Sequence, residues 1–145
     1  MYFNVRVYGL LINEHQEILL TDEQEKGYRF TKFPGGGLEF GEGLTDGLKR
    51  EFMEECNTEI DIIGHFYTTD FYVKSAFNNS QLISVYYLVK NVLPLKFPIK
   101  TKPFDFEEGV DTLQSFRWKK LSELKVDDVT FPIDKYVVEL LTKKI

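Results

Sequence analysis

A glycine-rich stretch, PGGGLEFGEG at residues 34–43, is the feature that most constrains how this chain folds. Glycine and proline both interrupt regular structure, so the stretch predicts a long structured loop. The next segment, residues 44–56, has the pattern of a helix and ends in the acidic run REFMEE. We therefore expect a glycine-rich loop directly before a helix that carries several carboxylates.

Acidic residues are concentrated in this part of the chain. The formal net charge is -5, and residues 39–55 hold six acidic and two basic residues, a local balance of -4. Concentrated carboxylates suit a site for hard divalent cations. Nucleic-acid-binding domains usually carry a basic stripe instead. The charge pattern thus predicts a cation site and no nucleic-acid partner.

Length and composition predict one ordinary domain covering residues 1–145. With 145 residues, 43% of them hydrophobic, the chain is long enough to form a core. The lone cysteine, Cys56, excludes an internal disulfide and is expected to be a buried thiol. We find no signal-peptide pattern and no apolar run of membrane-spanning length. These features predict a cytoplasmic protein without a membrane partner.

Strand-like segments surround the loop and the helix. The expected strands cover residues 3–12, 17–21, 28–33, 59–73, 81–90 and 113–118. Residues 22–27 are expected to form a loop, and residues 92–111, with three of the five prolines, an irregular segment. A short helical turn at 119–124 and an amphipathic helix from Pro132 complete the pattern. The fold class is predicted to be α+β, with a sheet, a central helix and a closing helix.

The carboxylates of the central helix lie together on a helical wheel. At roughly 100° per residue, Glu51, Glu54 and Glu55 share an arc of about 100° beside the apolar stripe of the helix. That stripe consists of Leu44, Leu48, Phe52 and Cys56. Like charges at this spacing repel by a few tenths of a kcal/mol per pair in water, and a divalent cation reverses that effect. A solvated helix face is the alternative explanation.

Gly47 lies among these glutamates on the same wheel. A glycine inside a helix costs about 1 kcal/mol relative to alanine. Close approach by another backbone, that of the glycine-rich loop, would explain it. A tolerated weak point in the helix is an equally good explanation.

Residues 36–58, GGLEFGEGLTDGLKREFMEECNT, resemble the Nudix box, G-x5-E-x7-R-E-U-x-E-E-x-G-U, in which U is apolar. The charged and first glycine positions are all filled, by Gly36, Glu42, Arg50, Glu51, Glu54 and Glu55. Asn57 and Thr58 depart from the final G-U. Asn is the best substitute for Gly in the left-handed conformation that ends a helix. A later W-x4-E-L pattern, within FRWKKLSEL, also resembles the family.

The resemblance implies an α/β/α sandwich with a mixed β-sheet, the Nudix fold. It implies a hydrolase dependent on Mg²⁺ or Mn²⁺ that cleaves the diphosphate of a nucleoside diphosphate linked to another group. Oxygen ligands suit such hard ions, and phosphoryl transfer requires mainly positioning and charge neutralisation. The glycine pattern fits neither a P-loop nor G-x-G-x-x-G.

The family analogy also assigns roles to the matching residues. Glu54, Glu55 and the Gly35 carbonyl would be metal ligands, and Glu51 a metal ligand or general base; Glu51 and Glu54 would thus be catalytic. Arg50 and Glu42 would pair and fasten the loop to the helix, with Gly36 and Gly47 as further supports. Some family members take an additional acidic residue from a later loop, for which Glu107, Glu108 and Asp111 compete, and Glu108 is preferred.

Substrate recognition lies outside the box. Arg29 and Lys32 flank the strand that enters the glycine-rich loop and are expected to reach phosphate oxygens, although ordinary surface charge explains them equally well. Lys96, Lys100 and Lys102 are more simply explained as solvated. Tyr2, Phe3, Tyr28, Phe30, Phe71 and Phe104 are candidate platforms for a base. The resemblance leaves a homodimer open as the assembly.

Two functions from different classes remain. The first is the metal-dependent hydrolase of a small nucleoside diphosphate derivative. The second is a catalytically inactive Nudix-like sensor that binds a nucleotide. Such sensors commonly lose box glutamates, and this chain keeps them all, so the enzyme is favoured. A structural domain with an acidic helix would require the box match to be a coincidence.

Overall fold

The computed structural model describes residues 1–107 and 113–143. Two residues predicted for the active site, Glu108 and its competitor Asp111, therefore lie outside the described residues. The chain divides into two compact units, each formed by two segments. Unit 1 comprises Met1–Leu11 and Pro34–Lys96, and unit 2 comprises Ile12–Phe33 and Phe97–Ile145. The prediction of a single domain stays a prediction.

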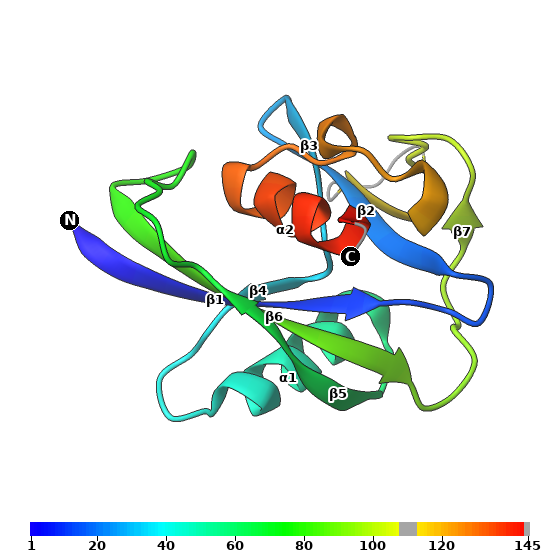
Figure 1. The fold of residues 1–145 in the computed structure, drawn as a ribbon, viewed down its shortest axis with the longest axis horizontal. Coiled ribbons are helices and arrows are strands. Elements are labelled where there is room, and N and C mark those ends of the chain that lie inside the picture. The colour runs from blue at the N-terminus through cyan, green and yellow to red at the C-terminus, as the bar shows by residue number, and fades with distance from the viewer. Residues whose placement is uncertain (108–112, 144–145) are drawn as a thin grey trace. The chain divides into compact units, whose positions relative to one another are not determined.

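Unit 1 contains a mixed four-stranded sheet and the central helix. The strand order is β4-β1-β6-β5, with β1 parallel to β6 and the other neighbours antiparallel. Helix α1 (Leu44–Cys56) contacts β1, β4 and β5 and lies along this sheet (Figure 1). The strands are β1 (Tyr2–Leu11), β4 (Gly35–Gly37), β5 (Ile60–Thr68) and β6 (Ser80–Asn91).

The apolar stripe of α1 forms the centre of the unit 1 core. Leu48, Phe52 and Cys56 are buried, as the helical wheel predicts, and Leu44 is half-buried. Gly9 of β1 admits the Phe52 ring, because a Cβ at Gly9 would lie 2.5 Å from it. The predicted buried thiol of Cys56 is confirmed.

The glycine-rich stretch is more regular than predicted. Gly35–Gly37 forms the short strand β4, which pairs with β1 so that Gly35 faces Tyr8, Gly36 faces Val7 and Gly37 faces Arg6. The expectation of loop throughout 34–43 is therefore wrong for these three residues. Strand pairing to a long neighbour supplies the backbone hydrogen bonds that composition alone does not reveal.

Asn57 ends α1 in the left-handed conformation, with φ 47° and ψ 42°, as predicted from its place in the box. Its backbone N–H donates to the Met53 carbonyl at 3.1 Å, and the Thr58 N–H donates to the Phe52 carbonyl at 3.2 Å. Thr58 is buried, and its hydroxyl donates to the Cys56 carbonyl at 2.8 Å. The two departures from the box thus preserve the helix end.

Unit 2 contains the second mixed sheet and the C-terminal helix. The strand order is β3-β2-β8-β7, with β7 parallel to β8 and the other neighbours antiparallel. Strand β2 continues through Glu25, so the loop predicted at 22–27 is wrong for most of its length. The elements are β2 (Glu17–Glu25), β3 (Tyr28–Lys32), β7 (Ile99–Lys100), β8 (Leu113–Lys120), the 3₁₀ turns Leu121–Glu123 and Val126–Asp128, and α2 (Pro132–Thr142).

A buried ion pair joins β2 and β8 within unit 2. The Arg117 Nε donates to Asp22 Oδ2 at 2.7 Å, and the Thr31 hydroxyl donates to the other Asp22 oxygen at 2.6 Å. Asp22 is fully buried, so these bonds replace the water that its carboxylate loses. Two mixed sheets and two α-helices confirm the α+β class. None of the helices in the described ranges is long and apolar enough to span a membrane.

Candidate active site

Arg50 is the centre of the hydrogen-bond network in unit 1. Its guanidinium donates to both oxygens of Glu42, at 2.9 and 2.7 Å, and to the Gly37 carbonyl at 3.0 Å. The same group donates to Glu51 Oε1 and Glu54 Oε2, each at 3.1 Å. The predicted pairing of Arg50 with Glu42 is present, and the bond to Gly37 connects the helix to β4. A bidentate Arg–carboxylate pair fixes both distance and orientation.

Close approach at Gly36 brings the backbone of β4 against the Glu51 carboxylate. A Cβ added at Gly36 would lie 2.6–2.7 Å from the three carboxylate atoms of Glu51. Only glycine leaves that space open. The Glu51 side chain is 12% exposed, whereas that of Glu54 is 58% exposed. The loop and the helix therefore hold Glu51 in a partly enclosed position.

The explanation suggested for Gly47, approach by another backbone, is wrong. A Cβ at Gly47 would instead lie 2.8 Å from Leu38 Cδ1 and 2.9 Å from Glu42 Oε1, which are side-chain atoms of the loop. Gly47 thus leaves room for the Glu42 carboxylate that binds Arg50. The glycine supports the loop, but through side chains, which a helical wheel cannot identify.

The donor set of α1 fits a hard divalent cation in its chemistry. Glu51, Glu54 and Glu55 supply only carboxylate oxygens, which Mg²⁺ and Mn²⁺ prefer. One of them, the Glu51 carboxylate, lies against Gly36 in the space that a Cβ would otherwise fill. Within residues 1–107 and 113–143, no three His, Cys, Asp or Glu side chains are gathered into one metal-binding group. Arg50 instead holds Glu51 and Glu54, so metal ligation by these residues and by the Gly35 carbonyl stays a prediction.

The Glu42 carboxylate is strongly stabilised in its charged form. Its hydrogen bonds to Arg50, and that from the Glu39 backbone N–H at 2.8 Å, lower the pKa of Glu42 from 4.5 to about 2. The same pairing raises the pKa of Arg50. Because the folded-state pKa lies below the ordinary value, the stability that Glu42 contributes is complete above about pH 4.5 and is lost as pH falls towards 2.

Replacement of Glu42 by Gln is expected to remove this acid-dependent stability. The wild-type protein should have the larger free energy of unfolding at neutral pH, and the difference should shrink steadily between pH 4.5 and pH 2. Urea unfolding measured across this range tests the prediction, with Glu59→Gln, an exposed acid outside the box, as the control. A difference that does not change with pH would contradict it.

The two basic residues predicted to bind substrate lie in unit 2 and already have partners there. The ammonium of Lys32 is buried and lies 3.2 Å from Glu23 Oε2. Arg29 is exposed, donates to Gln24 at 2.8 Å, and lies over the rings of Phe104 and Phe106. A phosphate contact by Lys32 would have to compete with Glu23. Their roles in binding substrate stay predictions.

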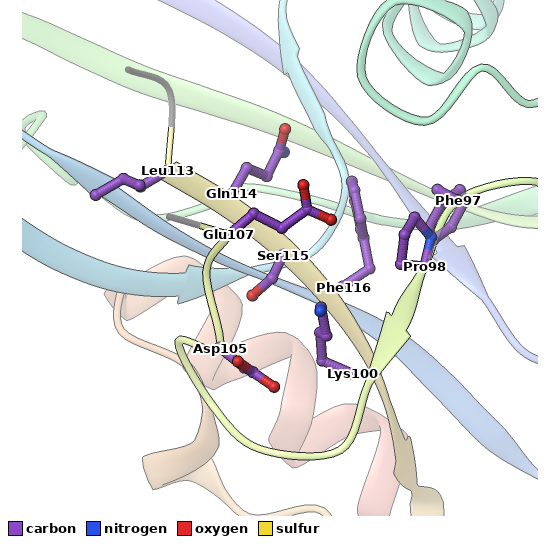
Figure 2. A pocket seen from close by; sticks show the side chains of 9 residues that line it. All are labelled: Phe97, Pro98, Lys100, Asp105, Glu107, Leu113, Gln114, Ser115 and Phe116. Carbon is purple, nitrogen blue, oxygen red and sulfur yellow. The ribbon is translucent and has the colours of Figure 1, made fainter. Parts of the chain in front are cut away.

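Unit 2 also contains a pocket of about 190 Å³ between residues 97–107 and β8 (Figure 2). The rings of Phe97 and Phe116, whose centroids are 4.4 Å apart, form the apolar part of the pocket. Lys100 and Glu107, two residues considered from the sequence, line it together with Gln114. Among the candidate platforms for a base, Phe30 is buried in the core of unit 2, whereas Tyr2, Phe3, Tyr28 and Phe71 are exposed.

Arg6 is a charged neighbour of the candidate site that the sequence did not predict. It lies in β1 opposite Gly37, and its Nη1 would be 3.6 Å from a Cβ at that glycine. Burial acts to lower the pKa of Arg6, but interactions with Tyr8, Glu51 and Glu55 outweigh it and raise that pKa. A charged residue at an interior position of a strand, in FNVRVYGLLI, was the available signal.

Comparison with known proteins shows the family of this chain. The NUDIX domain profile matches residues 3–141, nearly the whole chain. The protein belongs to the Nudix family. A search of curated proteins found no match.

Solved structures agree with the Nudix fold. A NUDIX hydrolase from Nitrosomonas europaea is 20% identical, with a TM-score of 0.68 over 94% of this chain and 86% of that one. The E. coli ORF135 protein is 17% identical, with a TM-score of 0.71 over 96% and 88% of the two chains. A MutT structure, from work on Aliivibrio salmonicida and Vibrio cholerae, is 22% identical, with a TM-score of 0.59 over 97% of both chains.

Proposed function

We propose that this Nudix protein is a hydrolase, dependent on Mg²⁺ or Mn²⁺, that cleaves the diphosphate bond of a small nucleoside diphosphate derivative. Nucleotide sugars, ADP-ribose-like compounds and nucleoside triphosphates are the candidate substrates. The observation that carries the proposal is the network around Arg50, which fixes Glu42 and β4 to the helix that presents Glu51 and Glu54. Every charged residue of the Nudix box is present; Glu42, Arg50, Glu51 and Glu54 form this network, and Glu55 follows Glu54 on the same helix.

Each residue has a part in this chemistry. Glu51, Glu54, Glu55 and the Gly35 carbonyl would hold the cation, which when bound would neutralise charge on the diphosphate oxygens. Glu51, enclosed against Gly36, would orient a water molecule or accept its proton. Arg50 neutralises neighbouring carboxylates and keeps Glu51 in one orientation.

The first test is a substrate panel with Mg²⁺ or Mn²⁺ in which phosphate-containing products are measured. The panel contains nucleotide sugars, ADP-ribose, dinucleoside polyphosphates, NADH and nucleoside triphosphates. We expect turnover of at least one compound and its loss on addition of EDTA, because carboxylates alone would repel the substrate. Turnover that persists in EDTA would contradict the mechanism. Tight nucleotide binding without product, even at high protein concentration, would favour the sensor instead.

The setting proposed for this activity is the cytoplasm, with a small-molecule substrate. Cys56 is buried, and a chain with one cysteine has no internal disulfide, which is compatible with a reducing compartment. A homodimer remains the proposed assembly by family analogy.

A further inference from the structure

Arg6 presents its guanidinium to one face of the short strand β4. It pairs in register with Gly37, and residues paired across an antiparallel ladder project their side chains to the same face. The adjacent Gly36 lies against the Glu51 carboxylate. Because side chains alternate between the two faces of a strand, Arg6 and Glu51 lie on opposite faces of β4. They lie against successive glycines, whose Cα atoms are about 3.8 Å apart in any trans peptide, and these glycines place no side chain between them.

Tyr8 anchors Arg6 from the same strand. Arg6 Nε donates to the Tyr8 hydroxyl at 2.6 Å, and the guanidinium carbon lies 5.7 Å from the centre of the Tyr8 ring. The Tyr8 ring is buried and stacks on Tyr86 with centroids 5.2 Å apart. The hydrogen bond to Tyr8 uses Nε, and within residues 1–107 and 113–143 neither terminal nitrogen of Arg6 donates a hydrogen bond.

Arg6 differs from the other arginine of unit 1, Arg50, in its partners. Arg50 lies within ion-pair distance of four carboxylates, whereas in the described part of the chain no carboxylate lies within that distance of Arg6. Arg6 is half-buried, and a guanidinium removed from water without an anionic partner is costly. The charges of Glu51 and Glu55 of the Nudix box interact favourably with the Arg6 guanidinium and act to raise its pKa.

We propose that Arg6 binds a non-bridging oxygen of the substrate's diphosphate through its terminal nitrogens. This inference rests on the proposed function, because it assumes that the diphosphate lies beside Glu51 and Glu55. A guanidinium matches two phosphate oxygens with two parallel N–H groups, and the anchoring by Tyr8 reduces the entropy lost on binding. The alternative is that Arg6 only balances the charge of the two glutamates.

Binding of methylenediphosphonate, a diphosphate analogue in which a CH₂ group replaces the bridging oxygen so that it cannot be hydrolysed, distinguishes diphosphate binding by Arg6 from simple charge balance. Calorimetric titration with saturating Mg²⁺ is expected to show at least about 10-fold weaker binding in Arg6→Gln, because a charge-assisted hydrogen bond is lost. Arg6→Lys keeps the positive charge but lacks the two parallel N–H groups of the guanidinium, so it should bind more tightly than Arg6→Gln and more weakly than wild type. Lys90→Gln removes an exposed charge from β6 of the same sheet and should bind as wild type.

Titration with Mg²⁺ alone supplies the second measurement. Arg6→Gln should bind the cation as tightly as wild type or more tightly, because a positive neighbour of Glu51 and Glu55 is removed. Unchanged methylenediphosphonate affinity in folded Arg6→Gln would overturn the proposal, as would equal weakening in Lys90→Gln. Tyr8→Phe, which removes only the anchoring hydroxyl, should show a smaller loss and serves as the second variant if Arg6→Gln does not fold.

The outcomes also separate this inference from the proposed function. If no compound in the panel is cleaved but diphosphonate binding depends on Arg6, the diphosphate site stands and the hydrolase proposal fails. If a substrate is cleaved and Arg6→Gln leaves its KM and the diphosphonate affinity unchanged, the hydrolase stands and the role of Arg6 fails.

Discussion

Replacement of Glu54 or Glu55 by Gln is expected to lower turnover of whichever panel substrate the protein cleaves by about 10²-fold or more. Each change removes one negative charge from the proposed cation site and keeps the size of the side chain. Electrostatic stabilisation is usually the largest single contribution to such catalysis, and one group commonly accounts for 10²–10³-fold in rate. The effect should appear mainly in kcat at saturating Mg²⁺.

The structure predicts that Glu54→Gln stays folded. Glu54 is 58% exposed, and its i,i+4 pair with Arg50 contributes about 0.5 kcal/mol or less. The free energy of unfolding measured in urea should therefore be nearly the same in Glu54→Gln as in the wild type. Glu59→Gln, just beyond the helix, is the matched control and should keep full activity. Wild-type turnover in both Glu54→Gln and Glu55→Gln would exclude these carboxylates from catalysis.

Alanine at two successive glycines of β4 is expected to have different effects: Gly35→Ala should mainly lower folding stability, and Gly36→Ala should mainly lower activity. At Gly35, with φ +147°, a Cβ would lie 2.1 Å from the Val7 carbonyl oxygen. Both backbones are fixed by strand pairing, so Gly35→Ala should cost about 3 kcal/mol or more of folding stability. At Gly36 the obstructing atoms are the far end of the Glu51 side chain, which can rotate away.

Gly36→Ala should therefore fold, with a stability loss of about 1 kcal/mol, and lose activity by about 10²-fold. Displacement of a catalytic group by about 1 Å is enough for such a loss. Gly43→Ala is the control from the same loop, because its φ is -76° and the added Cβ would meet only Asp46 Oδ2, at 3.5 Å. Urea unfolding and steady-state rates measured on all three variants test the contrast. Equal activity in Gly36→Ala and Gly43→Ala would show that the position of Glu51 does not matter.

The helix and its end were predictable because both depend on local sequence. Periodicity located α1 at Leu44–Cys56, and the preference of Asn for left-handed backbone accounted for Asn57. The spacing of the box also predicted the contact between Glu42 and Arg50, which are eight residues apart. In each case the decisive interaction lies within residues 36–58.

Features that depend on distant strands were missed. Strand β4 consists of three glycines, and only pairing with β1 makes it regular. Strand β2 extends to Glu25 because β3 and β8 pair with its polar end. Arg6 was overlooked for the same reason, because its neighbours Gly37, Glu51 and Glu55 are more than 30 residues away in the chain.

The register of β4 on β1 limits how the Nudix box can change in length. Side chains alternate between the two faces of a strand, so one residue inserted within Gly35–Gly37 would exchange the positions that now contact Glu51 and Arg6. An insertion near Gly41, where a Cβ would meet nothing within 4 Å, would leave that alternation intact. It would, however, change the number of residues between Gly36 and Glu42, whose carboxylate accepts hydrogen bonds from the Glu39 N–H and from Arg50. The length of the glycine-rich stretch is thus limited at one end by strand register and at the other by the reach of a single carboxylate.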